Sequence, residues 1–226
     1  MIELLLTLVS GVAWLAVYAG IIVLGFRQKS AAMPLFALGL NFAWEVLCTF
    51  TDIVFLAHGP LVGLNLAQVI VNVLWACFDL LIVVIYFKYG RERWPKSTRS
   101  WFIPGSLLVF ACCFALQGGF FVQFGAVDGA QYAAFLQNLL MSVLFMTMLF
   151  NRADTRGQSL VVGIAKWLGT LAPALLFGLI TQINPLIIVC GIFCCIFDIA
   201  YVILLSQKKK GRGTLSEAPG NTPFSA

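Results

Sequence analysis

Long apolar stretches separated by short polar connections make up most of the chain. Seven such stretches can be recognised, and the length of each is near the roughly 20 residues that an α-helix needs to cross a bilayer. The predicted spans are 4–26, 33–57, 61–87, 101–123, 130–150, 160–181 and 185–206. The pattern predicts an all-α integral membrane bundle of seven transmembrane helices that forms one catalytic domain over 1–206. The polar segment 207–226 is predicted to be a disordered cytoplasmic tail.

The composition excludes an ordinary soluble domain. Hydrophobic residues make up 61% of the 226 residues and charged residues 10%, whereas soluble domains are about 45–50% apolar and about 25% charged. The formal net charge of +5 does not indicate a nucleic-acid partner, because the basic residues are distributed among the connections between spans.

These basic residues predict the orientation of the chain in the membrane. Connections one, three and five and the tail carry Lys and Arg, whereas connections two, four and six contain neither. The positive-inside rule then places the N-terminus outside and the C-terminus in the cytoplasm. The chain is therefore predicted to be a multi-pass protein of a bacterial plasma membrane or of the endoplasmic reticulum.

Three acidic residues lie inside the predicted spans, and each directly follows an aromatic residue: Glu45, Asp79 and Asp198. A carboxylate in hydrocarbon costs several kcal/mol, so such residues usually face a bundle interior and indicate a functional site. We expect no Lys or Arg in mid-span to neutralise them, since Lys166 is assigned to the basic group around connection five. An unpaired carboxyl group in an apolar site favours its protonated form and can donate a proton.

The three acids are predicted to share one layer near the middle of the membrane. The helical rise places Asp79 about 13 Å from the cytoplasmic end of its span, Asp198 roughly 15 Å and Glu45 about 18 Å. A single site would further require spans two, three and seven to be neighbours.

Polar and aromatic residues share helical faces with the acids. They can form hydrogen bonds between helices, worth about 0.6 kcal/mol each in membrane proteins, or line a pocket, and the spacing alone leaves both readings open. The candidate lining residues are Asn41, Trp44, Gln68, Asn72, Trp75, Asn138 and Phe197.

A metal site is not predicted. All seven cysteines lie in apolar spans, where Cys behaves as a small hydrophobic residue. No Cys/His spacing suggests zinc, and we expect no cofactor.

Several motifs resemble a known family. The run Lys29–Pro34, the element Asn41-x-x-Trp44-Glu45, the segments 71–79 and 86–90, and the pair Phe197-Asp198 resemble the integral-membrane terpene cyclases of fungal meroterpenoid and indole-diterpene pathways and their bacterial relatives. The resemblance covers nearly the whole chain, because the length and the seven spans also fit.

The resemblance implies a cyclase that folds a linear polyprenyl chain attached to an aromatic or indole head. Such enzymes begin by protonating a terminal epoxide or alkene, and their important acids correspond to Glu45 and Asp198, with Asp79 as a further pocket acid. No Asp-rich motif for a metal-bound diphosphate occurs, so no magnesium is expected. The implied partners are a prenylated aromatic substrate, the lipid bilayer and, as an open question, a prenyltransferase or epoxidase of the same pathway.

Physical chemistry points to the same reaction from the residues themselves. Protonation of an alkene or epoxide needs a neutral carboxyl group, which an apolar pocket maintains. Aromatic faces then stabilise the carbocation by about 2 kcal/mol or more when water is excluded. The alternative from another class is a proton-coupled transporter of small solutes, which would use the same carboxyl groups in the middle of the membrane.

Overall fold

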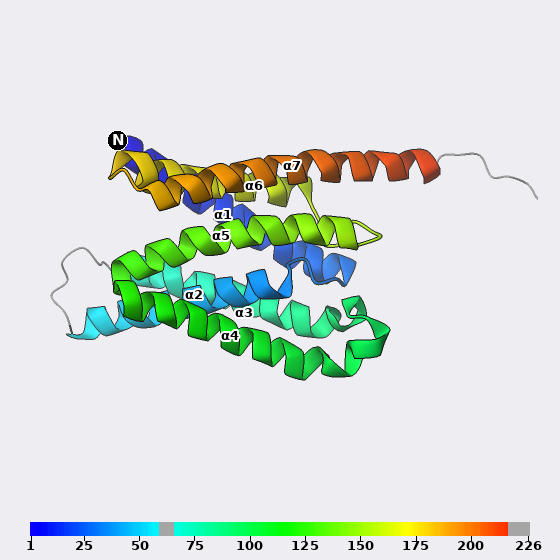
Figure 1. Ribbon diagram of the computed structural model, residues 1–226, viewed down its shortest axis with the longest axis horizontal. Helices are drawn as coiled ribbons and strands as arrows, with labels where there is room; N and C mark the ends of the chain where they lie inside the picture. The colour runs from blue at the N-terminus through cyan, green and yellow to red at the C-terminus, as the bar shows by residue number, and fades with distance from the viewer. Residues whose placement is uncertain (59–65, 217–226) are drawn as a thin grey trace, which may run out of the picture.

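The computed structural model describes residues 1–58 and 66–216, with side chains except at 56–58, 67, 68 and 212–216. Seven helices of the described chain are long and apolar enough to cross a membrane, which confirms the predicted all-α fold (Figure 1). They are α1 (Ile2–Gln28), α2 (Leu35–His58), α3 (Leu66–Tyr89), α4 (Phe102–Phe124), α5 (Ala126–Asn151), α6 (Leu160–Leu175) and α7 (Pro185–Ser216). Two 3₁₀ turns, η1 (Arg91–Arg93) and η2 (Lys96–Trp101), connect α3 to α4, and a π-helical turn, η3 (Leu176–Ile180), extends α6.

Proline residues set several of the helix boundaries. Pro34 precedes α2, and Pro185 is the first residue of α7, a position where the missing N–H costs nothing. The Asn184 side chain accepts a hydrogen bond from the Ile187 N–H at 3.3 Å and so caps α7. Pro173 lies inside α6, and the helix widens into the π turn η3 shortly after it, where membrane helices tolerate such a break.

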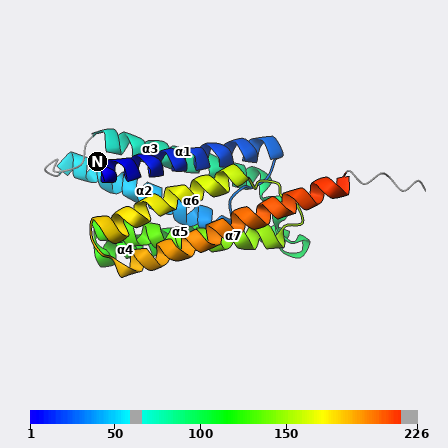
Figure 2. The same ribbon diagram turned by 90° about the horizontal axis from the view of Figure 1, so that it is seen from above.

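The seven helices form a closed ring. Going around it, each helix packs against the next in the order α1, α3, α2, α4, α5, α7, α6 and back to α1. Helices α2 and α5 also contact each other across the ring, as the two views suggest (Figures 1 and 2). This contact separates α4 from the larger part of the ring, which α1, α3, α2, α5, α7 and α6 enclose.

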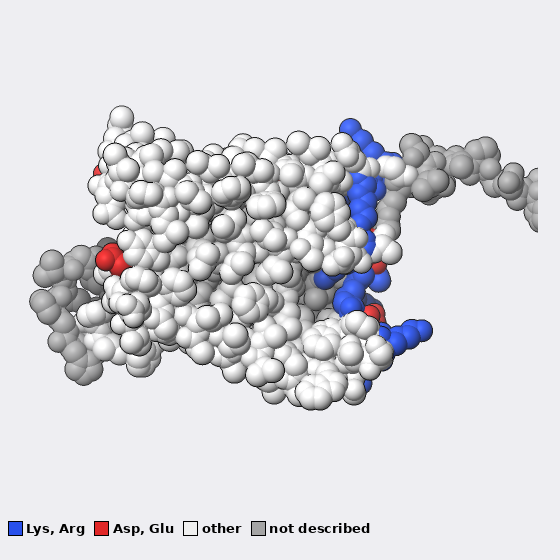
Figure 3. Space-filling model, in the orientation of Figure 1, with Lys and Arg blue, Asp and Glu red and all other residues white. Residues whose placement is uncertain are grey.

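The two ends of the bundle differ in charge. Lys and Arg gather at the end where α1, α3, α5 and α7 finish, which we call the basic end (Figure 3). By the positive-inside rule, the end richer in Lys and Arg corresponds to the cytoplasmic side. The N-outside orientation stays a prediction.

The last helix is longer than its predicted span. α7 continues beyond residue 206 to Ser216, and the rest of the predicted tail, 217–226, lies outside the described residues. The predicted division of the chain at 206 therefore stays a prediction.

An ion-pair cluster joins the connections at the basic end. Arg93 donates from Nη1 and Nη2 to the two carboxylate oxygens of Asp154, both at 3.1 Å, and from Nη2 to the Ser30 hydroxyl. Arg156 binds the same carboxylate through Nε at 3.0 Å. Burial opposes the charge of Asp154, but the hydrogen bonds from the two arginines outweigh it and lower its pKa to about 2.

Candidate active site

Two of the predicted acids meet around a tyrosine of the first helix. The Tyr18 hydroxyl oxygen lies 3.2 Å from Glu45 Oε1 and 3.3 Å from Asp79 Oδ2. Asn41 Nδ2 donates to both Tyr18 Oη and Asp79 Oδ2, each at 2.8 Å. Glu45 is 3% exposed and Asp79 0%. The network therefore ties α1, α2 and α3 together in the interior of the bundle.

Two glutamines extend this network across the ring. Gln137 Nε2 on α5 donates to Asn41 Oδ1 at 3.4 Å, and Gln117 Nε2 on α4 donates to Gln137 Oε1 at 2.7 Å. Gln117 also donates to the Leu40 carbonyl at 3.2 Å. These bonds fix the Asn41 amide, since its oxygen is occupied by Gln137 and its nitrogen must face Tyr18 and Asp79.

The supply of hydrogens in the network suits a neutral carboxyl group. The Tyr18 hydroxyl carries one hydrogen and can donate it to only one of the two acids at a time. None of the ion pairs among the described residues involves Glu45 or Asp79. Glu45 Oε2 and Asp79 Oδ1 are buried and accept no hydrogen bond from that part of the chain. A protonated Glu45 could instead donate to the Tyr18 oxygen, so the geometry is chemically consistent with a proton held between these groups.

A cavity of about 540 Å³ begins at this network. Tyr18, Asn41 and Glu45 lie on its wall, and it extends toward the end opposite the basic end, past Phe55 of α2 and Val127 near the start of α5. The volume falls in the range of small-molecule pockets. Its aromatic lining consists of Trp14, Tyr18, Trp44, Phe55, Trp75, Phe135 and Phe177.

Four of the predicted lining residues lie on this cavity. Asn41, Trp44, Trp75 and Asn138 all contribute to its wall, and the Trp44 indole N–H is fixed by the Ala130 carbonyl at 2.8 Å.

The remaining three predicted lining residues have other positions. Asn72 does not contribute to the cavity wall but donates to Asp52 Oδ2, and Asp52 does line the cavity. Phe197 is half-buried and does not belong to the wall. The side chain of Gln68 lies outside the described residues.

The expectation that no basic residue neutralises the acids is wrong for Asp198. Lys166 Nζ lies 3.0 Å from Asp198 Oδ1, 2.9 Å from Oδ2 and 2.6 Å from the Ser142 hydroxyl. Both charged side chains are nearly inaccessible, with 3% and 4% exposed. Lys166 lies about 9 Å along α6 from its first residue, Leu160, and its flexible side chain extends to Asp198. Lys166 is therefore an interior residue and not part of the connection between α5 and α6.

The three acids consequently fall into two groups. α2 and α3 are neighbours in the ring, which brings Glu45 and Asp79 together, whereas α7 packs between α5 and α6. Asp198 is not among the residues that line the cavity in the described chain. Its cluster borders the cavity through α5, because Ser142 donates to the carbonyl of Asn138, a residue of the wall.

Sequence reasoning missed Tyr18, Lys166, Gln117 and Gln137. Each of the four carries a signal that could have marked its position, although not its partner. The glutamines and the lysine are polar residues inside apolar runs, which is the criterion that selected the acids. Tyr18 follows Trp14 by one helical turn and could have been recognised as an amphipathic aromatic on the same face.

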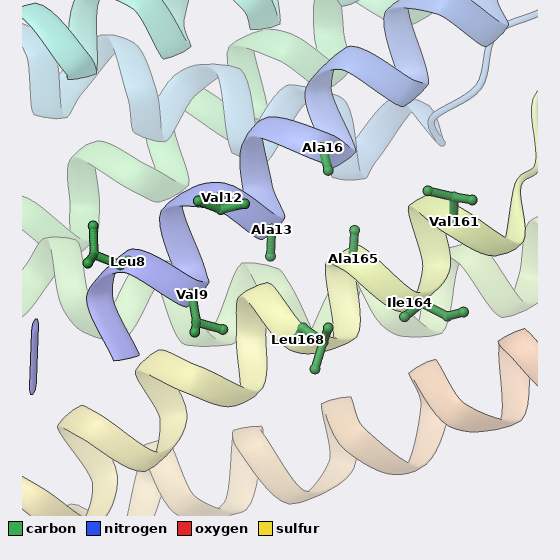
Figure 4. A pocket seen from close by; sticks show the side chains of 9 residues that line it. All are labelled: Leu8, Val9, Val12, Ala13, Ala16, Val161, Ile164, Ala165 and Leu168. Atoms are coloured by element: carbon green, nitrogen blue, oxygen red, sulfur yellow. The ribbon is translucent and has the colours of Figure 1, made fainter. Parts of the chain in front are cut away.

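A second hollow is purely hydrocarbon. This groove between α1 and α6 has a volume of about 620 Å³ and is lined by nine aliphatic side chains. Figure 4 shows these side chains on the two helices. It contains no group able to donate or accept a proton, and several of its residues, among them Val12 and Val161, are exposed on the outer face. The groove can accommodate an alkyl chain but cannot perform acid chemistry.

Comparison with known proteins gives one consistent family. A family model described as Pyr4-like transmembrane terpene cyclases matches residues 1–211, which confirms the resemblance seen in the motifs. The Pyr4-family terpene cyclase mfmH of Annulohypoxylon moriforme is 26% identical over 185 residues, covering 76% of this chain and 68% of the relative. Terpene cyclase pyr4 of Aspergillus fumigatus is 23% identical over 228 residues, covering 90% and 89%. No solved structure gives a significant match.

Proposed function

Because this chain belongs to the family of Pyr4-like transmembrane terpene cyclases, we propose that it cyclises the prenyl chain of a prenylated aromatic or indole substrate. The reaction starts when a carboxyl group of the protein protonates the terminal epoxide or alkene of that chain. The cation then closes rings within the cavity between α1, α2, α3, α5 and α6. The proposal agrees with the seven membrane-spanning helices, since a prenylated substrate dissolves in the bilayer.

Glu45 is the proposed proton donor. The observation that carries this assignment is its position on the cavity wall, with Oε1 held by the Tyr18 hydroxyl and Oε2 without a partner among the described residues. One oxygen is thus oriented, and we assign the proton transfer to the other, which has no hydrogen bond within the described chain to give up. An apolar, enclosed setting keeps such a carboxyl group protonated and reactive at neutral pH.

Asp79 and Asp198 receive supporting roles in this scheme. Asp79 lies behind the cavity, shares the Tyr18 hydroxyl with Glu45 and accepts a hydrogen bond from the Asn41 amide. It therefore positions the donor and can exchange a proton with it through Tyr18. Both oxygens of Asp198 accept hydrogen bonds from Lys166, and Asp198 does not line the cavity, so it is not placed to meet a substrate there. We therefore assign Asp198 to holding α6 and α7 against α5.

The aromatic wall is proposed to protect the cation. Trp44 and Trp75 lie on the cavity near Glu45, and Phe135 and Phe177 contribute further ring surfaces. An aromatic face attracts a desolvated cation by about 2 kcal/mol or more without forming a bond to it. The cascade ends when the cation releases a proton. The substrate has then gained one proton and lost one, so the product is its isomer, and return of a proton to Glu45 restores the enzyme.

The test is a direct assay of the protein in native membranes. A farnesylated phenol is supplied with a terminal alkene or a terminal epoxide, and the products are followed by mass and NMR. We expect a cyclic product of the same mass as the substrate. If sealed vesicles containing the protein instead moved protons together with a solute and formed no cyclic product, the transporter alternative would replace the cyclase.

A further inference from the structure

The cavity contains a second carboxyl group that the proposed chemistry does not use. Asp52 lies two helical turns beyond Glu45 on the same face of α2, about 10 Å further along the axis. The Asn72 side chain donates to Asp52 Oδ2 and so orients the group. Asp52 is half-buried, whereas Glu45 is fully buried, so the cavity has an enclosed acidic end and a more open one.

Several other polar groups on the cavity wall already bind the main chain. The hydroxyl groups of Ser10 and Thr51 donate to carbonyl oxygens at 2.9 and 2.8 Å. The indole N–H groups of Trp14 and Trp44 donate to carbonyl oxygens at 3.1 and 2.8 Å. These bonds occupy the donors of four side chains on the wall. A hydrogen-bond donor on a bound molecule would therefore meet an acceptor at Asp52 without a competing donor from these four side chains.

We propose that Asp52 is the recognition site for the aromatic head of the substrate and accepts a hydrogen bond from its phenolic O–H or ring N–H. The inference rests on the proposed function for the nature of the substrate. The carboxyl oxygens of Asp52 can accept a hydrogen bond, so Asp52 favours a head that carries a donor. With the head at Asp52, the prenyl chain runs along α2 between Trp44 and Trp75, and its terminus reaches Glu45.

The placement of the head determines which end of the chain is protonated. Glu45 protonates whatever double bond or epoxide lies next to it, and an apolar prenyl chain alone could slide along an apolar wall. A polar contact two helical turns away fixes the register of the chain against the acid. Asp52 is thus a specificity-determining residue, distinct from the group that delivers the proton.

Binding tests this inference separately from turnover. The probes are a ring-farnesylated phenol and its O-methyl ether, in which a methyl group replaces the hydrogen that the phenol donates. Binding to the purified protein is followed by quenching of tryptophan fluorescence. The variants are Asp52→Asn and Asn72→Ala, with Asp128→Asn as the matched control. Asp128 is an exposed carboxylate near the start of α5 that does not line the cavity.

We expect the parent protein and the Asp128→Asn control to bind the phenol about threefold to tenfold more tightly than the ether, the range for one net hydrogen bond. Asp52→Asn should lose most of this preference while its affinity for the ether stays the same, and Asn72→Ala should lose part of it. Equal binding of phenol and ether by the parent, or an unchanged preference in Asp52→Asn, would overturn the inference. A parent that shows the preference but forms no cyclic product would contradict the proposed function and leave head recognition standing.

Discussion

Lys166 and Asp198 form a two-oxygen ion pair between α6 and α7, with Nζ 3.0 and 2.9 Å from the two carboxylate oxygens. The Ser142 hydroxyl accepts a third bond from the same ammonium at 2.6 Å and brings in α5. A buried pair of this kind stabilises the fold only while both charges are present. Acidic residues inside membrane spans usually indicate a functional site. The pairing with Lys166 is consistent with the structural role that we propose for Asp198.

Removing one partner of this pair should therefore be costly. Lys166→Met leaves Asp198 as an uncompensated buried charge, and we expect the free energy of unfolding to fall by about 3–5 kcal/mol. The measurement is thermal or denaturant unfolding in detergent, with Lys88→Met, an exposed lysine at the end of α3, as the control. The double variant Lys166→Met with Asp198→Leu should recover most of the loss. If the double variant lost as much as the two single variants together, the pair would not act as a unit.

The Tyr18 hydroxyl should matter for catalysis more than for binding. Tyr18→Phe removes the group that orients Glu45 and leaves Asn41 without one of its two acceptors. We expect cyclisation to fall about tenfold or more, because a lost buried hydrogen bond costs about 1–3 kcal/mol. Substrate affinity should change little, since the ring stays in the cavity wall. Tyr89→Phe, outside the cavity at the basic end, is the control, and a variant Tyr18→Phe with the parental rate would remove Tyr18 from the mechanism.

The Asp154 cluster predicts an acid dependence of stability. The pKa of Asp154 is lowered to about 2 in the folded protein, against about 3.9 in an unfolded chain. Its contribution is thus fully present above about pH 4 and disappears as the pH falls through about 2. Asp154→Asn should lower the unfolding temperature at pH 7, and the difference from the parent should shrink across this window. A difference that stayed constant from pH 7 to pH 2 would show that the pairing with Arg93 and Arg156 contributes no charge-dependent stability.

The distribution of charge predicts the orientation in the membrane. A cysteine introduced in place of Lys96 at the basic end should be labelled by a membrane-impermeant maleimide only after the cells are opened. A cysteine in place of Asp128, at the opposite end, should be labelled in intact cells. Both are compared with the parent, whose seven cysteines lie within the helices. Labelling of the residue-96 cysteine in intact cells would reverse the orientation.

Much of this architecture could be predicted because it follows from local properties of the chain. The length of each apolar run and the charges of the connections specified seven helices, and the cost of a charge in hydrocarbon selected Glu45 and Asp79 as interior residues. The order of the helices around the ring depends on side-chain packing between distant segments, which no local pattern encodes. Hence the separation of Asp198 from the other two acids could not be predicted.

Lys166 shows a second limit of the same reasoning. Its position near the start of an apolar run is equally compatible with a side chain that extends to the interface and one that extends inward. Only the placement of Asp198 on the adjoining helix decides between the two. The same holds for Tyr18, whose role depends on α1 packing against α3.

The rate of cyclisation by Glu45→Gln, compared with the parent in the same membranes, tests the central claim most directly. The substitution keeps the size of the side chain and removes its transferable proton, so the rate should fall by at least about 10²-fold, the lower range for general acid catalysis. Tryptophan quenching by the substrate should be unchanged, and Glu3→Gln, an exposed glutamate on α1, should behave like the parent. A Glu45→Gln variant that forms the cyclic product at the parental rate would contradict the account.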